Sequence, residues 1–246
     1  MFVCLFVSAQ DKPDPNFHLY ILIGQSNMAG RGVISDEFKN QGNPNLYMLD
    51  KQNQWVTAKN PLHFDKPKIV GVGPGMMFGI RMAETDPKSK IGLIPCAVGG
   101  TAIDAWEPGG YDKATNTHPY DDAVIRIKEA MKFGVIKGVI WHQGEANSTA
   151  EQSKTHLNQL TALIERVREL TKKPDLPFVV GELGRYRADY QYINHELARL
   201  PATVKVTAVA SSEGLVDKGD QTHFDSPSAN EMGKRMADKM IKLQKN

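Results

Sequence analysis

Cysteine is almost absent from this sequence. Only Cys4 and Cys96 occur in 246 residues, and Cys4 falls in the apolar segment 1–10, which ends near the small residues Ser8 and Ala9. That segment is shorter than the roughly 20 apolar residues needed to cross a bilayer, so it predicts no membrane span. We interpret it as the end of a secretory signal peptide that lacks its basic start and is cleaved near Ala9, with a buried N-terminal strand as the alternative. Cleavage would leave Cys96 alone, which excludes an internal disulfide, and would make the protein secreted or periplasmic.

An excess of charge of either sign is also missing. Thirty basic residues against 28 acidic ones leave a net charge of +2, and no Lys/Arg cluster is long enough to predict nucleic-acid binding. Hydrophobic residues make up 41% and charged residues 24% of the chain, which is typical of a soluble globular protein. No internal repeat interrupts residues 11–246, which we expect to form a single domain. Nothing in the sequence implies an obligate protein partner.

Metal ligands at useful spacing are lacking too. His142 and Glu145 have His-x-x-Glu spacing, but no further His or Cys residues follow at the intervals of a zinc site. The sequence therefore predicts no metal site.

What the sequence does contain is an alternation of strand and helix patterns, repeated five times. The apolar, β-branched runs that predict buried strands lie at residues 18–23, 91–95, 135–141, 178–182 and 204–210. Such alternation predicts an α/β fold, a five-stranded parallel sheet with helices on both faces joined by right-handed crossovers. Between residues 31 and 68 the chain is rich in Gly, Asn and Pro, and we expect a long loop with a hairpin there.

Ser26 lies directly after the first predicted strand, which stops at Gly24. Loops at the carboxyl ends of parallel strands converge on a crevice where ligands collect, so a hydroxyl there is placed to act as a nucleophile. The alternative is that Ser26 only caps the next helix. The segment lacks the second glycine of the Gly-x-Ser-x-Gly elbow, which argues against the α/β-hydrolase arrangement. Its neighbours Gln25 and Asn27 are candidate substrate-binding residues.

Near the other end of the chain, Asp220 precedes His223 by three residues on one predicted loop. At that spacing the carboxylate can hold one ring nitrogen and leave the other free to take a proton from a serine hydroxyl. Ser26, Asp220 and His223 are therefore the predicted catalytic residues.

Two further predicted strands end in loops with polar or glycine residues. Gly100 follows the second strand, and its N–H could donate to an oxyanion or merely form a tight turn. Trp106, in the Gly/Pro-containing loop beyond it, could stack on a sugar ring or cover the core. After the third strand, Gln143 could donate its side-chain N–H to the oxyanion, beside the N–H of Ser26. Glu145 could support His223 or replace Asp220 as its acid.

Four motifs together resemble the SGNH (GDSL-like) hydrolase superfamily, and more narrowly its sialate O-acetylesterase and carbohydrate esterase family 6 acetylxylan esterase branch. The motifs are Gly-Gln-Ser-Asn-Met at 24–28, Gly-Gly-Thr at 99–101, Trp-His-Gln-Gly-Glu at 141–145 and Asp-x-x-His at 220–223. The asparagine that usually helps to bind the oxyanion in the superfamily is Gln143 here, which matches the narrower branch. The resemblance implies a flavodoxin-like, three-layer α/β/α fold.

The resemblance also implies a serine esterase that removes O-acetyl groups from a carbohydrate through an acetyl-serine intermediate and needs no cofactor. We expect acetylxylan-type substrates ahead of acetylated sialic acid. Two alternatives remain: a non-catalytic carbohydrate-binding protein, against which the intact Ser26, Asp220 and His223 argue, and a lipid or thioester hydrolase, which the lack of an apolar lid sequence disfavours.

Overall fold

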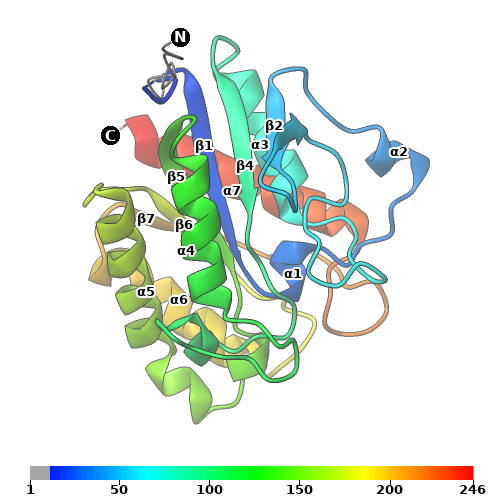
Figure 1. Cartoon of the computed structure of the whole chain (residues 1–246). Helices are drawn as coiled ribbons and strands as arrows, with labels where there is room; N and C mark the ends of the chain where they lie inside the picture. Colours follow the sequence, from blue (N-terminus) through cyan, green and yellow to red (C-terminus); the bar gives the residue numbers. More distant parts are fainter. Residues whose placement is uncertain (1–11, 246) are drawn as a thin grey trace, which may run out of the picture.

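A seven-stranded sheet forms the centre of the molecule (Figure 1). A computed structural model describes residues 12–245 of the chain, so the predicted signal-peptide segment 1–10 lies outside the described residues. The strands are β1 (Phe17–Gly24), β2 (Leu46–Leu49), β3 (Trp55–Thr57), β4 (Lys90–Pro95), β5 (Val135–His142), β6 (Phe178–Gly181) and β7 (Thr207–Ala210).

The order of strands across the sheet is β3-β2-β4-β1-β5-β6-β7, with β1 in the middle. All neighbouring strands run parallel except β3, which pairs antiparallel with β2. The sheet therefore has seven strands and not the predicted five. The two additional strands form the hairpin that was expected between residues 31 and 68. Their three or four residues are too few to show a strand period, so the sequence did not indicate that β2 would join the sheet beside β4.

Helices cover both faces of the sheet, which confirms the predicted three-layer α/β/α architecture. One face is covered by α4 (Pro119–Ala130), α5 (His156–Thr171) and α6 (Tyr190–Thr203), and the other by α3 (Pro74–Thr85) and α7 (Ser226–Lys245). Short helical segments lie in the loops: α1 (Ser26–Ala29), α2 (Asp36–Lys39), η1 (Ile103–Trp106), η2 (Glu145–Asn147) and η3 (Gln152–Thr155).

The central strand β1 shows how the two hydrophobic cores are separated. Successive side chains of a strand point to opposite faces of a sheet. Accordingly Leu19, Ile21 and Ile23 pack in the core beneath α4, α5 and α6, whereas Tyr20 and Leu22 pack in the core beneath α3 and α7. Because β1 is covered on both faces, it is buried and mainly apolar after His18, which is why its sequence was recognisable as a buried strand.

One buried histidine makes the stability of this fold depend on pH. Both ring nitrogens of His156, at the start of α5, lack a hydrogen-bond partner among residues 12–245. Burial lowers the pKa of His156 to about 4, although Asp104 opposes the shift. Between pH 4 and the ordinary histidine pKa of about 6.5, the unfolded chain binds more protons than the folded one, so acidification favours unfolding.

We therefore expect the free energy of unfolding to fall by about 3 kcal/mol through His156 alone between pH 7 and pH 4. Denaturant titrations of the wild-type protein and of His156→Leu across this range would measure the effect, and the variant should show the smaller decline. His195→Leu, which replaces an exposed imidazole of α6, is the control. An identical decline in His156→Leu and the wild-type protein would contradict the assignment.

Candidate active site

The turn that presents Ser26 depends on Gly24, the last residue of β1. Gly24 has φ +133°, and a Cβ at this position would lie 2.2 Å from the carbonyl oxygen of His142. The close approach lets the N–H of Gln25 donate to that carbonyl at 2.9 Å, which ties the end of β1 to the end of β5. Only glycine permits both the conformation and the contact. The chain then turns into α1 with Ser26 as its first residue.

Ser26 meets His223 across almost the whole length of the chain. The Oγ of Ser26 lies 3.0 Å from Nε2 of His223, although 197 residues separate them in the sequence. Ser26 is 6% exposed, and the imidazole of His223 is 22% exposed, so the pair lies at the surface without being freely solvated. His223 belongs to the loop between β7 and α7, which passes beside α1 in Figure 1.

Asp220 holds the other side of the same imidazole. Its Oδ2 accepts a hydrogen bond from Nδ1 of His223 at 2.7 Å, while its Oδ1 accepts the backbone N–H groups of His223 and Thr222 at 2.8 and 3.0 Å. Partial burial by itself raises the pKa of Asp220, but these hydrogen bonds outweigh it and hold the pKa well below its usual range. An ionised carboxylate only accepts hydrogen bonds, so the proton of the ring lies on Nδ1 and the Nε2 lone pair faces the hydroxyl of Ser26.

Glu145, the alternative acid, forms neither a hydrogen bond nor an ion pair with His223. Its Oε1 accepts a hydrogen bond from Nδ2 of Asn27 at 2.5 Å and lies 3.8 Å from Nδ1 of His142. The carboxylate is 4% exposed. The structure thus brings Ser26, His223 and Asp220 into one hydrogen-bonded chain. Glu145 is linked to the loop of His223 through the side chain of Asn27.

Two backbone N–H groups at this edge of the sheet are available to an oxyanion. Ser26 is the first residue of α1, and the first N–H groups of a helix have no acceptor inside it. Gly100, in the loop after β4, has φ +92° and is exposed, and its N–H has no acceptor within residues 12–245. The N–H groups of Ser26 and Gly100 are the two backbone donors that the sequence analysis named, and their role in binding an oxyanion stays a prediction.

A buried ion pair that the sequence analysis missed holds the loop that contains Gly100. Oδ2 of Asp65 accepts a hydrogen bond from the N–H of Gly99 at 2.8 Å and another from the guanidinium of Arg31 at 2.8 Å. Both side chains are at most 3% exposed. Burial raises the pKa of Asp65, but Arg31 and the Gly99 N–H lower it more, so it lies below its ordinary value. No local spacing could have indicated this pair, because 34 residues separate its members.

The side-chain amide of Gln143 donates its hydrogen bonds within the protein. Its Nε2 donates to Oδ1 of Asn147 at 2.7 Å and to the carbonyl oxygen of Thr101 at 3.3 Å, so both side-chain protons are already used. The N–H of Ile103 also donates to Oδ1 of Asn147, which identifies that atom as an acceptor and fixes the orientation of the Gln143 amide. Gln143 is fully buried. In this geometry Gln143 joins the loops after β4 and β5, and its predicted part in the oxyanion hole stays a prediction.

The three candidate substrate-binding side chains are all buried. Trp106 is 1% exposed, packs edge-to-face against Trp141 and donates from Nε1 to Oγ1 of Thr101, so it belongs to the core and cannot stack on a sugar. Gln25 is 3% exposed, and its Oε1 accepts the N–H of Ala146 at 3.4 Å. Asn27 is 4% exposed, with its whole amide engaged by other residues of the protein. In this geometry Trp106 does not face a ligand, whereas the contacts of Gln25 and Asn27 with substrate stay predictions.

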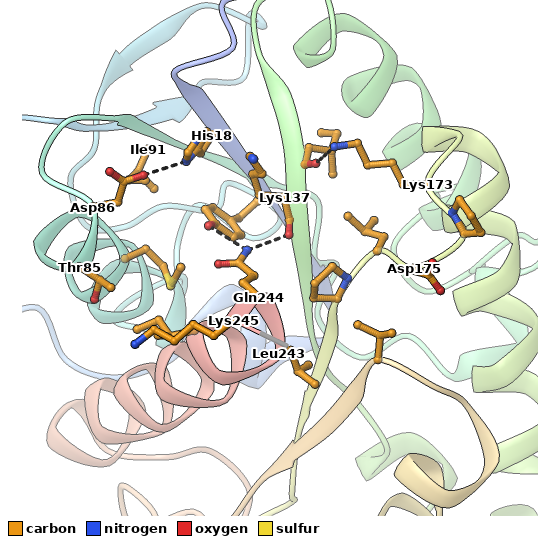
Figure 2. A pocket seen from close by; sticks show the side chains of 18 of the residues that line it. His18, Thr85, Asp86, Ile91, Lys137, Lys173, Asp175, Leu243, Gln244 and Lys245 are labelled. Atoms are coloured by element: carbon orange, nitrogen blue, oxygen red, sulfur yellow. Dashed lines mark hydrogen bonds and ion pairs between the residues drawn. The ribbon is translucent and has the colours of Figure 1, made fainter.

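A cavity of about 950 Å³ lies at the opposite edge of the sheet, at the start of β1 and β5 (Figure 2). Its lining includes His18, Lys137 and Lys173, and Gln244 of α7 donates there to the carbonyl oxygen of Lys137. It includes none of the predicted catalytic residues. Residues 12–245 contain neither a cluster of three His, Cys, Asp or Glu side chains that could hold a metal ion nor a helix of sufficient length and apolarity to cross a membrane.

Comparisons with known proteins agree with the resemblance found in the motifs. Residues 16–242 match the family model described as carbohydrate esterase, sialic acid-specific acetylesterase. A probable carbohydrate esterase of Arabidopsis thaliana is 32% identical over 253 residues, which cover 93% of this chain and 94% of the plant protein. Human sialate O-acetylesterase is 32% identical over 133 residues, which cover 44% of this chain and 25% of the human protein.

Solved structures show the same relationship. The crystal structure of the Arabidopsis protein matches with a TM-score of 0.80 at 30% identity, covering 93% of this chain and 99% of that one. The crystal structure of NanS matches with a TM-score of 0.73 at 17% identity, covering 94% and 99%, which is a likeness of fold alone. Since the family model and the plant relative both span nearly all of the chain, it belongs to the sialic acid-specific acetylesterase family of carbohydrate esterases, which are carboxylic ester hydrolases.

Proposed function

We propose that this protein is a serine esterase that removes O-acetyl groups from carbohydrates. The observation that carries the proposal is the continuous hydrogen-bonded chain from the Oγ of Ser26 through His223 to Asp220, at 3.0 and 2.7 Å. A hydroxyl, an imidazole in the correct tautomer and an ionised carboxylate in this order are the parts of acyl transfer by nucleophilic catalysis.

In the first half of the reaction, Nε2 of His223 takes the proton of Ser26 while Oγ attacks the acetyl carbonyl carbon. The carbonyl oxygen becomes an oxyanion, which the N–H groups of Ser26 and Gly100 stabilise. When the intermediate collapses, the bond from carbon to the sugar oxygen breaks, and Nε2 returns its proton to that oxygen. The products of this half are a free sugar hydroxyl and acetyl-Ser26.

In the second half, water replaces the sugar. Nε2 of His223 takes a proton from the water as its oxygen attacks the acetyl carbon, and the bond to the Oγ of Ser26 then breaks with return of that proton. Acetate leaves and the enzyme is restored. Asp220 keeps Nδ1 protonated throughout and offsets the charge of the transient imidazolium. No step needs a cofactor.

For the substrate, we infer an acetylxylan-type polysaccharide or oligosaccharide. The segment 1–10, interpreted as the end of a signal peptide, suits a secreted or periplasmic enzyme acting on a polymer that cells do not take up whole. Acetylated sialic acid is the second candidate, and the description of the matching family model favours it.

Acetate release from acetylxylan, O-acetylated sialic acid and p-nitrophenyl acetate tests the proposal. We expect hydrolysis of p-nitrophenyl acetate together with at least one carbohydrate ester. A higher kcat/KM on acetylxylan than on the sialate would support the first substrate, and the reverse order would replace it with the second. Failure of all three esters with correctly folded protein would contradict the proposed activity.

A further inference from the structure

The side chain of Asn27, next to the nucleophile, holds the backbone on both sides of His223. Its Oδ1 accepts the N–H of Phe224 at 3.0 Å, and its Nδ2 donates to the carbonyl oxygen of Thr222 at 3.0 Å. One amide therefore binds the residue before His223 and the residue after it. Because Asn27 directly follows Ser26, these bonds and the Ser26–His223 contact form a closed ring between the two loops.

A buried carboxylate orients this amide. The second proton of Nδ2 of Asn27 is donated to Oε1 of Glu145 at 2.5 Å, and the Glu145 side chain is 4% exposed. A hydrogen bond to an ionised acceptor is stronger than one between neutral groups. Glu145 thus fixes which end of the amide carries the nitrogen, so that Oδ1 is left to face Phe224.

A second side chain supports the same carbonyl group from another loop. The hydroxyl of Tyr186 donates to the carbonyl oxygen of Thr222 at 3.0 Å, and its ring packs against Phe224. Asp220 binds the backbone N–H of His223 itself. Side chains from α1, from the loop after β6 and from the loop of His223 itself thus restrain the peptide groups around His223.

We propose that Asn27, oriented by Glu145, is a positioning residue that sets the distance between His223 and Ser26. The inference rests on the proposed function, because it assigns how the catalytic histidine is held. Asn27 neither donates to the substrate nor transfers a proton. It acts through His223, and Glu145 acts through Asn27, which gives the buried acid a role that differs from that of Asp220.

The first test is Asn27→Ala, with kcat and KM measured on p-nitrophenyl acetate. A displacement of a catalytic group by about 1 Å can cost about 10²-fold in rate, so we expect kcat to fall by about that factor while KM changes less than about threefold. The rate at which phenylmethylsulfonyl fluoride sulfonylates Ser26 should fall in parallel, since that reaction also needs His223 to take the serine proton but uses no acetyl group.

Asn194→Ala is the matched control. The side-chain amide of Asn194 also binds a backbone through both of its ends. Its Oδ1 accepts the N–H of Leu183 at 2.8 Å, and its Nδ2 donates to the carbonyl oxygen of the same residue at 2.9 Å. Among residues 12–245, its amide makes no hydrogen bond with Ser26, Asp220 or His223. A loss of loop structure in general would lower kcat equally in both variants, whereas positioning of His223 predicts a loss in Asn27→Ala alone.

A second pair of variants keeps the shape of the side chain and tests the part of Glu145. Asn27→Asp removes both donors and places two carboxylates together, so its kcat should fall at least as far as that of Asn27→Ala. When Glu145→Gln is added, the new amide at position 145 can donate to the new carboxylate at position 27, so the pair again has one donor and one acceptor. We expect kcat of this double variant to be at least threefold higher than that of Asn27→Asp alone. The carbonyl oxygen of Thr222 still lacks the donor that Asn27 supplied and keeps only the hydroxyl of Tyr186, so the rescue should stay incomplete.

The proposal is overturned if Asn27→Ala or the isosteric Asn27→Asp keeps kcat within twofold of the wild-type value, or if Asn194→Ala loses as much. The double variant tests the role of Glu145 on its own. If its kcat is no higher than that of Asn27→Asp, Glu145 does not orient Asn27. Ser26→Ala distinguishes these failures from a failure of the proposed function. An inactive Ser26→Ala beside a fully active Asn27→Ala leaves the esterase assignment intact and removes only the positioning role.

Discussion

Ser26→Ala is expected to abolish acetate release while the protein remains folded. The substitution removes a single oxygen, which within the described residues 12–245 makes a side-chain hydrogen bond only with Nε2 of His223. Without the nucleophile no acetyl-enzyme can form, and the loss of such a residue in comparable enzymes costs about 10⁴-fold or more in kcat. Initial rates of acetate release from acetylxylan, acetylated sialic acid and p-nitrophenyl acetate would measure the effect.

Unfolding curves of the same variant provide the control. The free energy of unfolding should stay close to that of the wild-type protein, because α1 and the turn at Gly24 do not use the serine hydroxyl for capping. Near-wild-type acetate release by folded Ser26→Ala would exclude Ser26 as the nucleophile. Carbohydrate binding without acetate release by the wild-type protein would instead favour the non-catalytic alternative.

The inner strands of the sheet were predictable because burial on both faces makes a parallel strand continuously apolar. This applies to β1 and to β5, whose apolar runs end at polar residues on the same edge of the sheet. The hairpin of β2 and β3 gave a weaker signal. Its strands have only four and three residues, and β3 is exposed along part of its length at the edge. The pattern was therefore too short to predict that β2 would pair with β4.

Within the site, contacts between residues close in the sequence were predictable from their spacing, whereas most contacts across the chain were not. Ser26 and His223 are the exception, because the chemistry of their motifs predicted the pairing although 197 residues separate them. Asp220 and His223 are three residues apart, so their spacing alone indicated their contact. The pair of Arg31 and Asp65 and the bond between Asn27 and Glu145 span 34 and 118 residues, and only the folded chain brings them together. Local sequence patterns can indicate that a polar side chain at the end of a strand could bind a ligand or take part in catalysis. They cannot show which of its atoms already bind other groups of the protein, as the two bonds donated by Nε2 of Gln143 demonstrate.

The largest remaining effect is expected from the acid that serves His223. In Asp220→Asn, the backbone N–H groups of His223 and Thr222 still require an acceptor where Oδ1 now lies. The amide oxygen must therefore take that place, and the amide nitrogen must face Nδ1 of the imidazole. Two donors cannot share one hydrogen bond, so the ring proton moves to Nε2, which can then no longer accept the proton of Ser26.

We expect Asp220→Asn to lower kcat by up to about 10⁴-fold with little change in fold, which kinetics on p-nitrophenyl acetate and unfolding curves would measure. Glu145→Gln is the paired variant. Its amide oxygen can still accept from Nδ2 of Asn27, so only the charge is lost and kcat should fall far less, by several-fold. Since Glu145 reaches His223 only through Asn27, it cannot replace Asp220 without moving the loop between β7 and α7. If folded Glu145→Gln proved the more damaging substitution, Glu145 and not Asp220 would be the acid of the catalytic triad.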